Sequence, residues 1–161
     1  MGTESVPSTV VITPEAFLAH WQGHRRLTRR VIEAFPEDQL FSFSVGDMRS
    51  FGALALEMLG MATPMVRGVV TGEWAQYAPI EARSRDEILR LWDETTGQLE
   101  SLWPQIPLES FQTTITAFGM YTGPVYELLL YVIDNEIHHR GQGYVYLRAL
   151  GIEPPGFWVR D

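Results

Sequence analysis

The chain has 161 residues and a formal net charge of −8, and it contains neither cysteine nor lysine. The charge argues against nucleic-acid backbones and anionic membranes as main partners. The missing residue types exclude disulfides, thiolate ligands, Schiff bases and a Walker-type phosphate loop. We find no signal peptide, and the apolar stretches look too short or too interrupted to span a bilayer, so we expect a cytoplasmic protein. The length is typical of one domain, which we assign to residues 1–161.

Two helices are predicted in the first half of the chain. After a loose lead-in over residues 1–12, Thr13-Pro14-Glu15 provides a helix N-cap, a first-turn proline and an acidic residue at the positive end of the helix dipole. Apolar residues then recur at helical spacing to about Ala34. Ser50 caps a second helix, which we extend through Met58 toward Val70.

Two more helices are predicted in the second half. Ser84 and Glu87 form a capping box that opens the third helix, and prolines from Pro104 onward end it. Residues 108–121 read as a long connection with strand-like character at Thr113 to Ala117. The fourth helix is predicted to start at Thr122 and to run to Leu150. These elements predict an all-α fold: a single-domain four-helix bundle with long connections after the second and third helices.

The fourth helix places ionisable groups among apolar residues, which is costly unless the groups are paired or bind metal. Asn135 and His139 share one face at i, i+4, a spacing that allows two side chains to bind one metal ion. His138 points about 100° away. The alternative is that His139 is a hydrogen-bonded core histidine and His138 is a surface histidine. Glu136 and Arg140, also at i, i+4, are predicted to form a salt bridge.

Glu57 is the one polar side chain between Phe51 and Ala62. It lies either on a solvated strip of the second helix or in the core, where an arginine, a protonated histidine or a metal would stabilise its anion. Considered together with Asn135 and His139 on another apolar helix, it predicts a polar site shared between the two helices.

Two further groups lie on the first helix. His20 and His24 are an i, i+4 pair that matches a metal pair, but spacing alone has low specificity and we expect packed or solvated histidines instead. The arginine-rich run at residues 25–30 could bind phosphate. In an acidic chain we expect it instead to pair with nearby acids, which are Glu33, Glu37 and Asp38.

Several strings in the chain resemble the DinB-like family. They are His138-His139-Arg140-Gly141-Gln142, Tyr146 to Gly151, Pro154-Pro155, Ser50-Phe51-Gly52 and Thr71-Gly72-Glu73-Trp74. The resemblance implies a four-helix bundle, often dimeric, in a group regarded as metalloenzymes. Some of its relatives are transferases or isomerases that use bacillithiol or mycothiol. We therefore expect a homodimer with a site for a small-molecule ligand, and neither nucleic acid nor membrane as partner.

The family's usual metal ligands are three histidines, one on the second helix and two at i, i+4 on the fourth. The resemblance maps them to Glu57, Asn135 and His139, so one histidine of the three is present here. Glutamate is a competent ligand for Zn²⁺, Ni²⁺ or Mn²⁺, whereas an asparagine carbonyl is a weak, neutral one.

Two functional hypotheses follow from this ligand set. In the first, Glu57, Asn135 and His139 weakly bind a divalent metal ion in a metal-dependent hydrolase, or in a transferase that uses an external low-molecular-weight thiol. In the second, no metal is bound and Glu57 and His139 form an ion pair in a non-catalytic binding or interaction protein.

Overall fold

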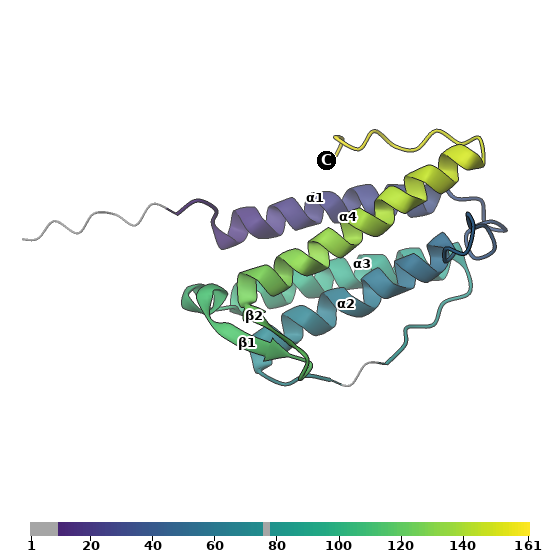
Figure 1. Ribbon diagram of the computed structural model, residues 1–161. Coiled ribbons are helices and arrows are strands. Elements are labelled where there is room, and N and C mark those ends of the chain that lie inside the picture. The colour runs from purple at the N-terminus through teal and green to yellow at the C-terminus, as the bar shows by residue number, and fades with distance from the viewer. Residues whose placement is uncertain (1–9, 76–77) are drawn as a thin grey trace, which may run out of the picture.

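The computed structural model describes residues 10–75 and 78–161, and it confirms the all-α four-helix bundle (Figure 1). Residues 10–12 of the expected lead-in are exposed, and residues 1–9 lie outside the described residues. The four helices are α1 (Pro14–Ala34), α2 (Phe51–Thr71), α3 (Arg85–Leu102) and α4 (Val125–Ala149).

Side-chain caps set the starts of the first three helices, as the sequence predicts. The Thr13 hydroxyl accepts from the backbone N–H of Ala16, and the Ser84 hydroxyl accepts from that of Glu87. Ser50 caps α2 in the same way. These bonds satisfy N–H groups that have no partner within the helix.

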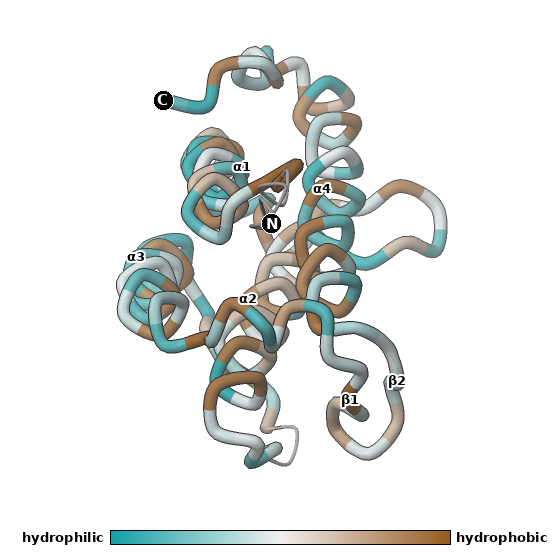
Figure 2. Tube along the Cα trace, turned by 90° about the vertical axis from the view of Figure 1, so that its left-hand side faces the viewer, coloured by the Kyte–Doolittle hydropathy of each residue, from teal (hydrophilic) through white to brown (hydrophobic). Residues whose placement is uncertain are grey.

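The helices do not alternate in direction along the chain. In Figure 1, α1 and α4 run one way, and α2 and α3 both run the other way. The connection over residues 72–84 makes this possible, because it is long enough to return along a helix of 21 residues. Figure 2, which views the bundle nearly end-on, shows α1 beside α4 and α2 beside α3.

The start of the fourth helix differs from the prediction. Residues Thr114–Ala117 (β1) and Tyr121–Pro124 (β2) form an antiparallel hairpin, so Thr122 lies in a strand and α4 begins at Val125. Two short 3₁₀ helices, Trp103–Gln105 (η1) and Leu108–Gln112 (η2), precede the hairpin. A residue before proline avoids helical geometry, and this places the helix start after Pro124.

The core consists of two apolar clusters. One lies toward the hairpin and includes Trp21, Trp103 and Leu129; the other lies toward the opposite end and includes Phe51 and Trp92. Buried polar side chains on α1 and α4 separate the two clusters. We call this set the polar layer, and its members are His24, Arg25, Thr28, Glu136 and Arg140.

Helix α2 meets the length and hydropathy criteria for crossing a membrane, contrary to the expectation that no stretch would. Its most apolar window has a mean hydropathy of 1.3, and half of that window is buried inside the bundle. The same helix carries Glu57 on its face toward α4, where the carboxylate bonds to side chains of that helix. Its apolar composition therefore fits a core helix of the bundle.

Candidate functional site

The carboxylate of Glu57 bonds to three side chains. Its Oε1 lies 2.9 Å from His139 Nε2 and accepts from Asn135 Nδ2 at 3.1 Å. Its Oε2 forms an ion pair with Arg49, which precedes α2. The structure therefore brings together the three residues that the sequence selected, and it adds an arginine.

The charge of Glu57 is stabilised by these donors. Partial burial raises the pKa of Glu57, but hydrogen bonds from Asn135, Arg49 and His139 outweigh it and lower that pKa to about 2. The side chain is 29% exposed. The residue therefore lies at the edge of the bundle interior, between the two positions that the sequence left open.

His139 is buried and has a partner at each ring nitrogen. A carboxylate accepts hydrogen bonds, so Nε2 carries the hydrogen that it shares with Glu57. The other nitrogen, Nδ1, lies 3.2 Å from the amide oxygen of Gln142. The Gln142 amide nitrogen in turn contacts the exposed His138 at 3.2 Å. Thus His139 belongs to the site, while His138 lies outside it, as helical geometry predicted.

Arg49 is the member of the site that sequence reasoning missed. Its side chain is 54% exposed, and its backbone oxygen accepts from the Tyr146 hydroxyl at 2.8 Å, which ties the residue to α4. The signal was faint: Arg49 precedes the helix cap by one residue and lies eight positions before Glu57. A long side chain at that spacing can reach down the first two turns of the helix.

The predicted Glu136–Arg140 salt bridge is wrong. Both side chains are buried, and each turns toward α1. Glu136 accepts from Trp21 Nε1 at 3.3 Å and from the Thr28 hydroxyl at 2.6 Å. Arg140 donates to that hydroxyl at 3.1 Å and contacts His24 Nδ1 at 3.0 Å. Burial raises the pKa of Glu136 despite the nearby arginines.

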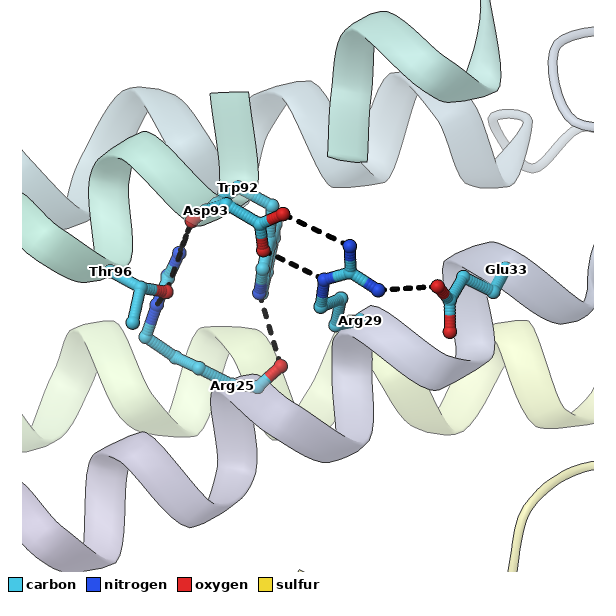
Figure 3. Close-up of polar contacts among 6 residues, drawn as sticks. All are labelled: Arg25, Arg29, Glu33, Trp92, Asp93 and Thr96. Atoms are coloured by element: carbon cyan, nitrogen blue, oxygen red, sulfur yellow. Dashed lines mark hydrogen bonds and ion pairs between the residues drawn. The ribbon is translucent and has the colours of Figure 1, made fainter. Parts of the chain in front are cut away.

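The arginines of the run on α1 bond to different parts of the protein. Figure 3 shows Arg29 paired with Glu33, as predicted, and also with Asp93 of α3. In the same view, Arg25 contacts the backbone of Trp92 and the hydroxyl of Thr96. Its guanidinium carbon lies 4.2 Å from the centroid of the Trp92 ring, a cation–π contact.

The expected pairing with the other two acids is not observed. Glu37 pairs with Arg85 of α3, and Asp38 accepts from Gln39. Arg26 and Arg30 instead bond to backbone oxygens near the end of the chain. The sequence suggested local pairing because these acids follow the run closely, but the helix directs each arginine toward a different neighbour.

The histidine pair of α1 is split: His24 lies in the polar layer, whereas His20 is exposed. His24 is buried, and its Nε2 lies 3.2 Å from His20 Nε2. Desolvation, followed by repulsion from Arg140 and Arg160, lowers the pKa of His24 to about 3. A guanidinium contacts each ring nitrogen of His24, an environment unfavourable to a metal cation.

Within residues 10–75 and 78–161, no three histidine, aspartate or glutamate side chains converge as a set of metal ligands. The Glu57 site reaches three donors only by counting the amide of Asn135.

Comparison with known proteins supports the assignment suggested by the sequence strings. No curated protein matches the chain. The fold is similar to that of a DinB-like protein from Bacillus subtilis, with a TM-score of 0.74 and 23% identity over 90% of this chain and 99% of that one. It is also similar to a DinB-like protein from Bacillus cereus, with a TM-score of 0.68 and 21% identity over 88% and 95% of the two chains. The model of the DinB family matches residues 5–161, and the chain therefore belongs to that family.

Proposed function

We propose that this protein is a metal-independent member of its family, in which the Glu57 site binds a small polar ligand. One observation carries the proposal: protein donors already occupy both oxygens of the Glu57 carboxylate. Two of these donors, Asn135 and His139, are the residues that would otherwise share a metal with it. The third, Arg49, supplies positive charge at the place where a metal ion would have to supply it.

The donor set does not fit a divalent metal. A metal ion needs the lone pair of His139 Nε2, whereas this nitrogen presents its hydrogen to Glu57. Asn135 likewise presents its N–H to the carboxylate. A divalent ion would also lie beside the guanidinium of Arg49, and like charges in proximity are destabilising. With a single carboxylate present, the site has little negative charge to offset that repulsion.

The chemistry of the site suits a ligand with acceptor groups. Arg49 is more than half exposed, and the contact with Glu57 uses one of its nitrogens. A guanidinium has five N–H donors in a planar fork, which matches a carboxylate or carbonyl compound. His139 is buried and holds the carboxylate in place, and Gln142 contacts the other nitrogen of its ring.

A second candidate is the metal-dependent enzyme, acting as a hydrolase or as a thiol-dependent transferase. The observation that favours it is Asn135 Oδ1, which is buried and has no hydrogen-bond partner among the described residues. Rotation of the amide would aim this oxygen toward Glu57. Asn135 could then serve as a ligand beside Glu57 and His139, provided that Arg49 swings into solvent.

Elemental analysis of protein purified without chelators separates the two candidates, together with thermal shift on adding Zn²⁺, Ni²⁺ or Mn²⁺. The metal-independent proposal expects less than stoichiometric metal and no metal-dependent shift. The double variant Glu57→His/Asn135→His presents three imidazoles and should bind Zn²⁺, so it serves as the positive control. Stoichiometric metal in the wild type, lost in His139→Ala, would establish the enzyme candidate instead.

We also propose a homodimer, formed through the outer face of α4. This face exposes Leu130, Ile137 and Val145, which are 39%, 37% and 58% exposed and recur at seven- and eight-residue spacing. One helix face can meet its own copy across a two-fold axis. Sedimentation velocity should show a dimer that Ile137→Glu dissociates. The matched change Leu108→Glu, on a different exposed residue, should leave it intact.

A further inference from the structure

The C-terminal segment lies along α1 and brings an additional arginine to the polar layer. Arg26 donates to the backbone oxygen of Arg160 at 2.8 Å, and Arg30 donates to that of Asp161 at 2.7 Å. At Gly23 a Cβ atom would lie 3.3 Å from Arg160 Cβ, so the segment packs closely on the helix. Figure 1 shows this segment running back along the helix. The Arg160 side chain reaches His24 as a result.

The hydrogen bonds of His24 cannot all form at once. Arg140 Nη2 lies 3.0 Å from His24 Nδ1, and Arg160 Nη1 lies 3.0 Å from His24 Nε2. Arginine donates hydrogen bonds and never accepts them, and a neutral imidazole accepts at one nitrogen only. Because His24 is buried between two cations, it is neutral at physiological pH. One of the two guanidinium groups therefore faces an N–H instead of an acceptor.

Arg160 is the group left without its acceptor. Arg140 is the more deeply buried of the two, at 5% exposure, and a buried donor gains most from a bond to His24 Nδ1. That arrangement places the hydrogen of His24 on Nε2, where His20 accepts it at 3.2 Å. Arg160 Nη1 then points at a donor. Its Nε is also buried with no partner within the described part of the chain.

A third donor lies on α4, where the charges of Arg140 and Arg160 act on it. The Tyr144 hydroxyl, one turn beyond Arg140 on α4, is buried and has no hydrogen-bond partner in residues 10–75 and 78–161. Burial raises the pKa of Tyr144, and the charged groups that oppose this shift are four arginines, namely Arg30, Arg140, Arg148 and Arg160. The one carboxylate among the residues of the polar layer, Glu136, already accepts from Trp21 and Thr28.

We propose that Arg160 and Tyr144, beside the positive charge of Arg140, form a binding site for a phosphate-type oxyanion at the junction of α1, α4 and the C-terminal segment. The site has surplus donors and surplus positive charge, and it lacks acceptors. A tetrahedral oxyanion presents acceptor oxygens in every direction and carries the compensating charge. It would accept from the Arg160 nitrogens and from the Tyr144 hydroxyl at the same time. Arg160 and Tyr144 are both half-buried residues, so the site lies at the edge of the bundle rather than in its core.

Isothermal titration calorimetry of the full chain with inorganic phosphate tests the site, with sodium chloride at equal ionic strength as the blank. Phosphate should bind, and Arg160→Gln should weaken binding at least about tenfold. Tyr144→Phe removes one hydroxyl and leaves the packing unchanged, so it should fold normally and weaken binding about three- to tenfold. Arg90→Gln changes an exposed arginine on α3 and should bind phosphate like the wild type.

A titration with phenyl phosphate distinguishes the two sources of this chemistry. Tighter binding than inorganic phosphate would assign the site to an organic phosphate monoester, and weaker binding would assign it to the free ion. The proposal is overturned if neither compound gives heat above the chloride blank. It is equally overturned if Arg160→Gln and Tyr144→Phe bind as tightly as Arg90→Gln, because the anion would then be bound elsewhere. Neither result depends on whether the Glu57 site binds metal.

Discussion

Replacing Glu57 by glutamine tests the central contact of the candidate site. The donors around the carboxylate lower its pKa from the ordinary value of 4.5 to about 2, and this difference corresponds to ~3 kcal/mol of stabilisation. The side chains of Glu57 and Arg49 are 29% and 54% exposed, so solvent screens part of that energy. We therefore expect Glu57→Gln to reduce the free energy of unfolding by about 2 kcal/mol at pH 7.

The pH dependence gives the sharper test. Because the folded-state pKa lies below the unfolded one, the stabilisation is complete above pH 4.5 and is lost as the pH falls toward 2. The difference between the wild type and Glu57→Gln should therefore shrink by about half at pH 3. Urea unfolding followed by tryptophan fluorescence measures it, with the exposed Glu100→Gln as the matched control. A difference below about 0.5 kcal/mol at pH 7, or one that does not change with pH, would refute the reasoning.

Three further changes probe the packing around the site. His24 should stay neutral to about pH 3 in the folded protein, so it should destabilise the wild type progressively as the pH falls below 6.5, by at most about 5 kcal/mol. Urea titrations at several pH values should show that His24→Asn removes this contribution, most clearly above pH 4.5, where Glu57 keeps its charge. At Gly143 a Cβ atom would lie 2.4 Å from the ring of Phe51 on α2, so Gly143→Ala should lower the stability of the fold by about 1–3 kcal/mol. At Gly141 nothing lies within 4 Å of such an atom, so Gly141→Ala should raise the stability by up to about 1 kcal/mol. Equal melting temperatures of the two variants would contradict both expectations. Arg25→Lys should lower the free energy of unfolding by about 2–4 kcal/mol, because lysine cannot reproduce the planar stacking and the paired bonds of the guanidinium. The control Arg90→Lys, at an exposed arginine, should change the free energy of unfolding in urea by less than about 0.5 kcal/mol.

The candidate site was predictable to the extent that helical periodicity governs it. Steps of three and four residues selected His139 over His138, and they placed Asn135 on the same line. The structure has both side chains bonded within one network around Glu57. The position of Arg49 was not predictable in this way, because it lies in a connection, where no periodicity indicates the direction of a side chain.

In the polar layer, by contrast, helical spacing predicted the side-chain contacts wrongly. The spacing of Glu136 and Arg140 allows a local salt bridge, and on an exposed helix that bond would be the default. Here α1 packs against that face and offers a hydroxyl, an indole N–H and an imidazole, so both side chains bond across the interface instead. A buried group bonds to whatever the neighbouring element presents, and sequence spacing contains no information about that neighbour.

The sequence by itself determined the four helices, the capped starts of the first three and the face of each helix that enters the core, because these features depend on local bonds and on a period of 3.6 residues. Only the tertiary structure decided that α2 and α3 run parallel, that the hairpin precedes α4, and that the arginines of α1 bind the C-terminal segment. Those outcomes depend on which helices become neighbours. That choice is made by the fit of whole apolar faces and by the reach of long connections, which local sequence patterns do not encode.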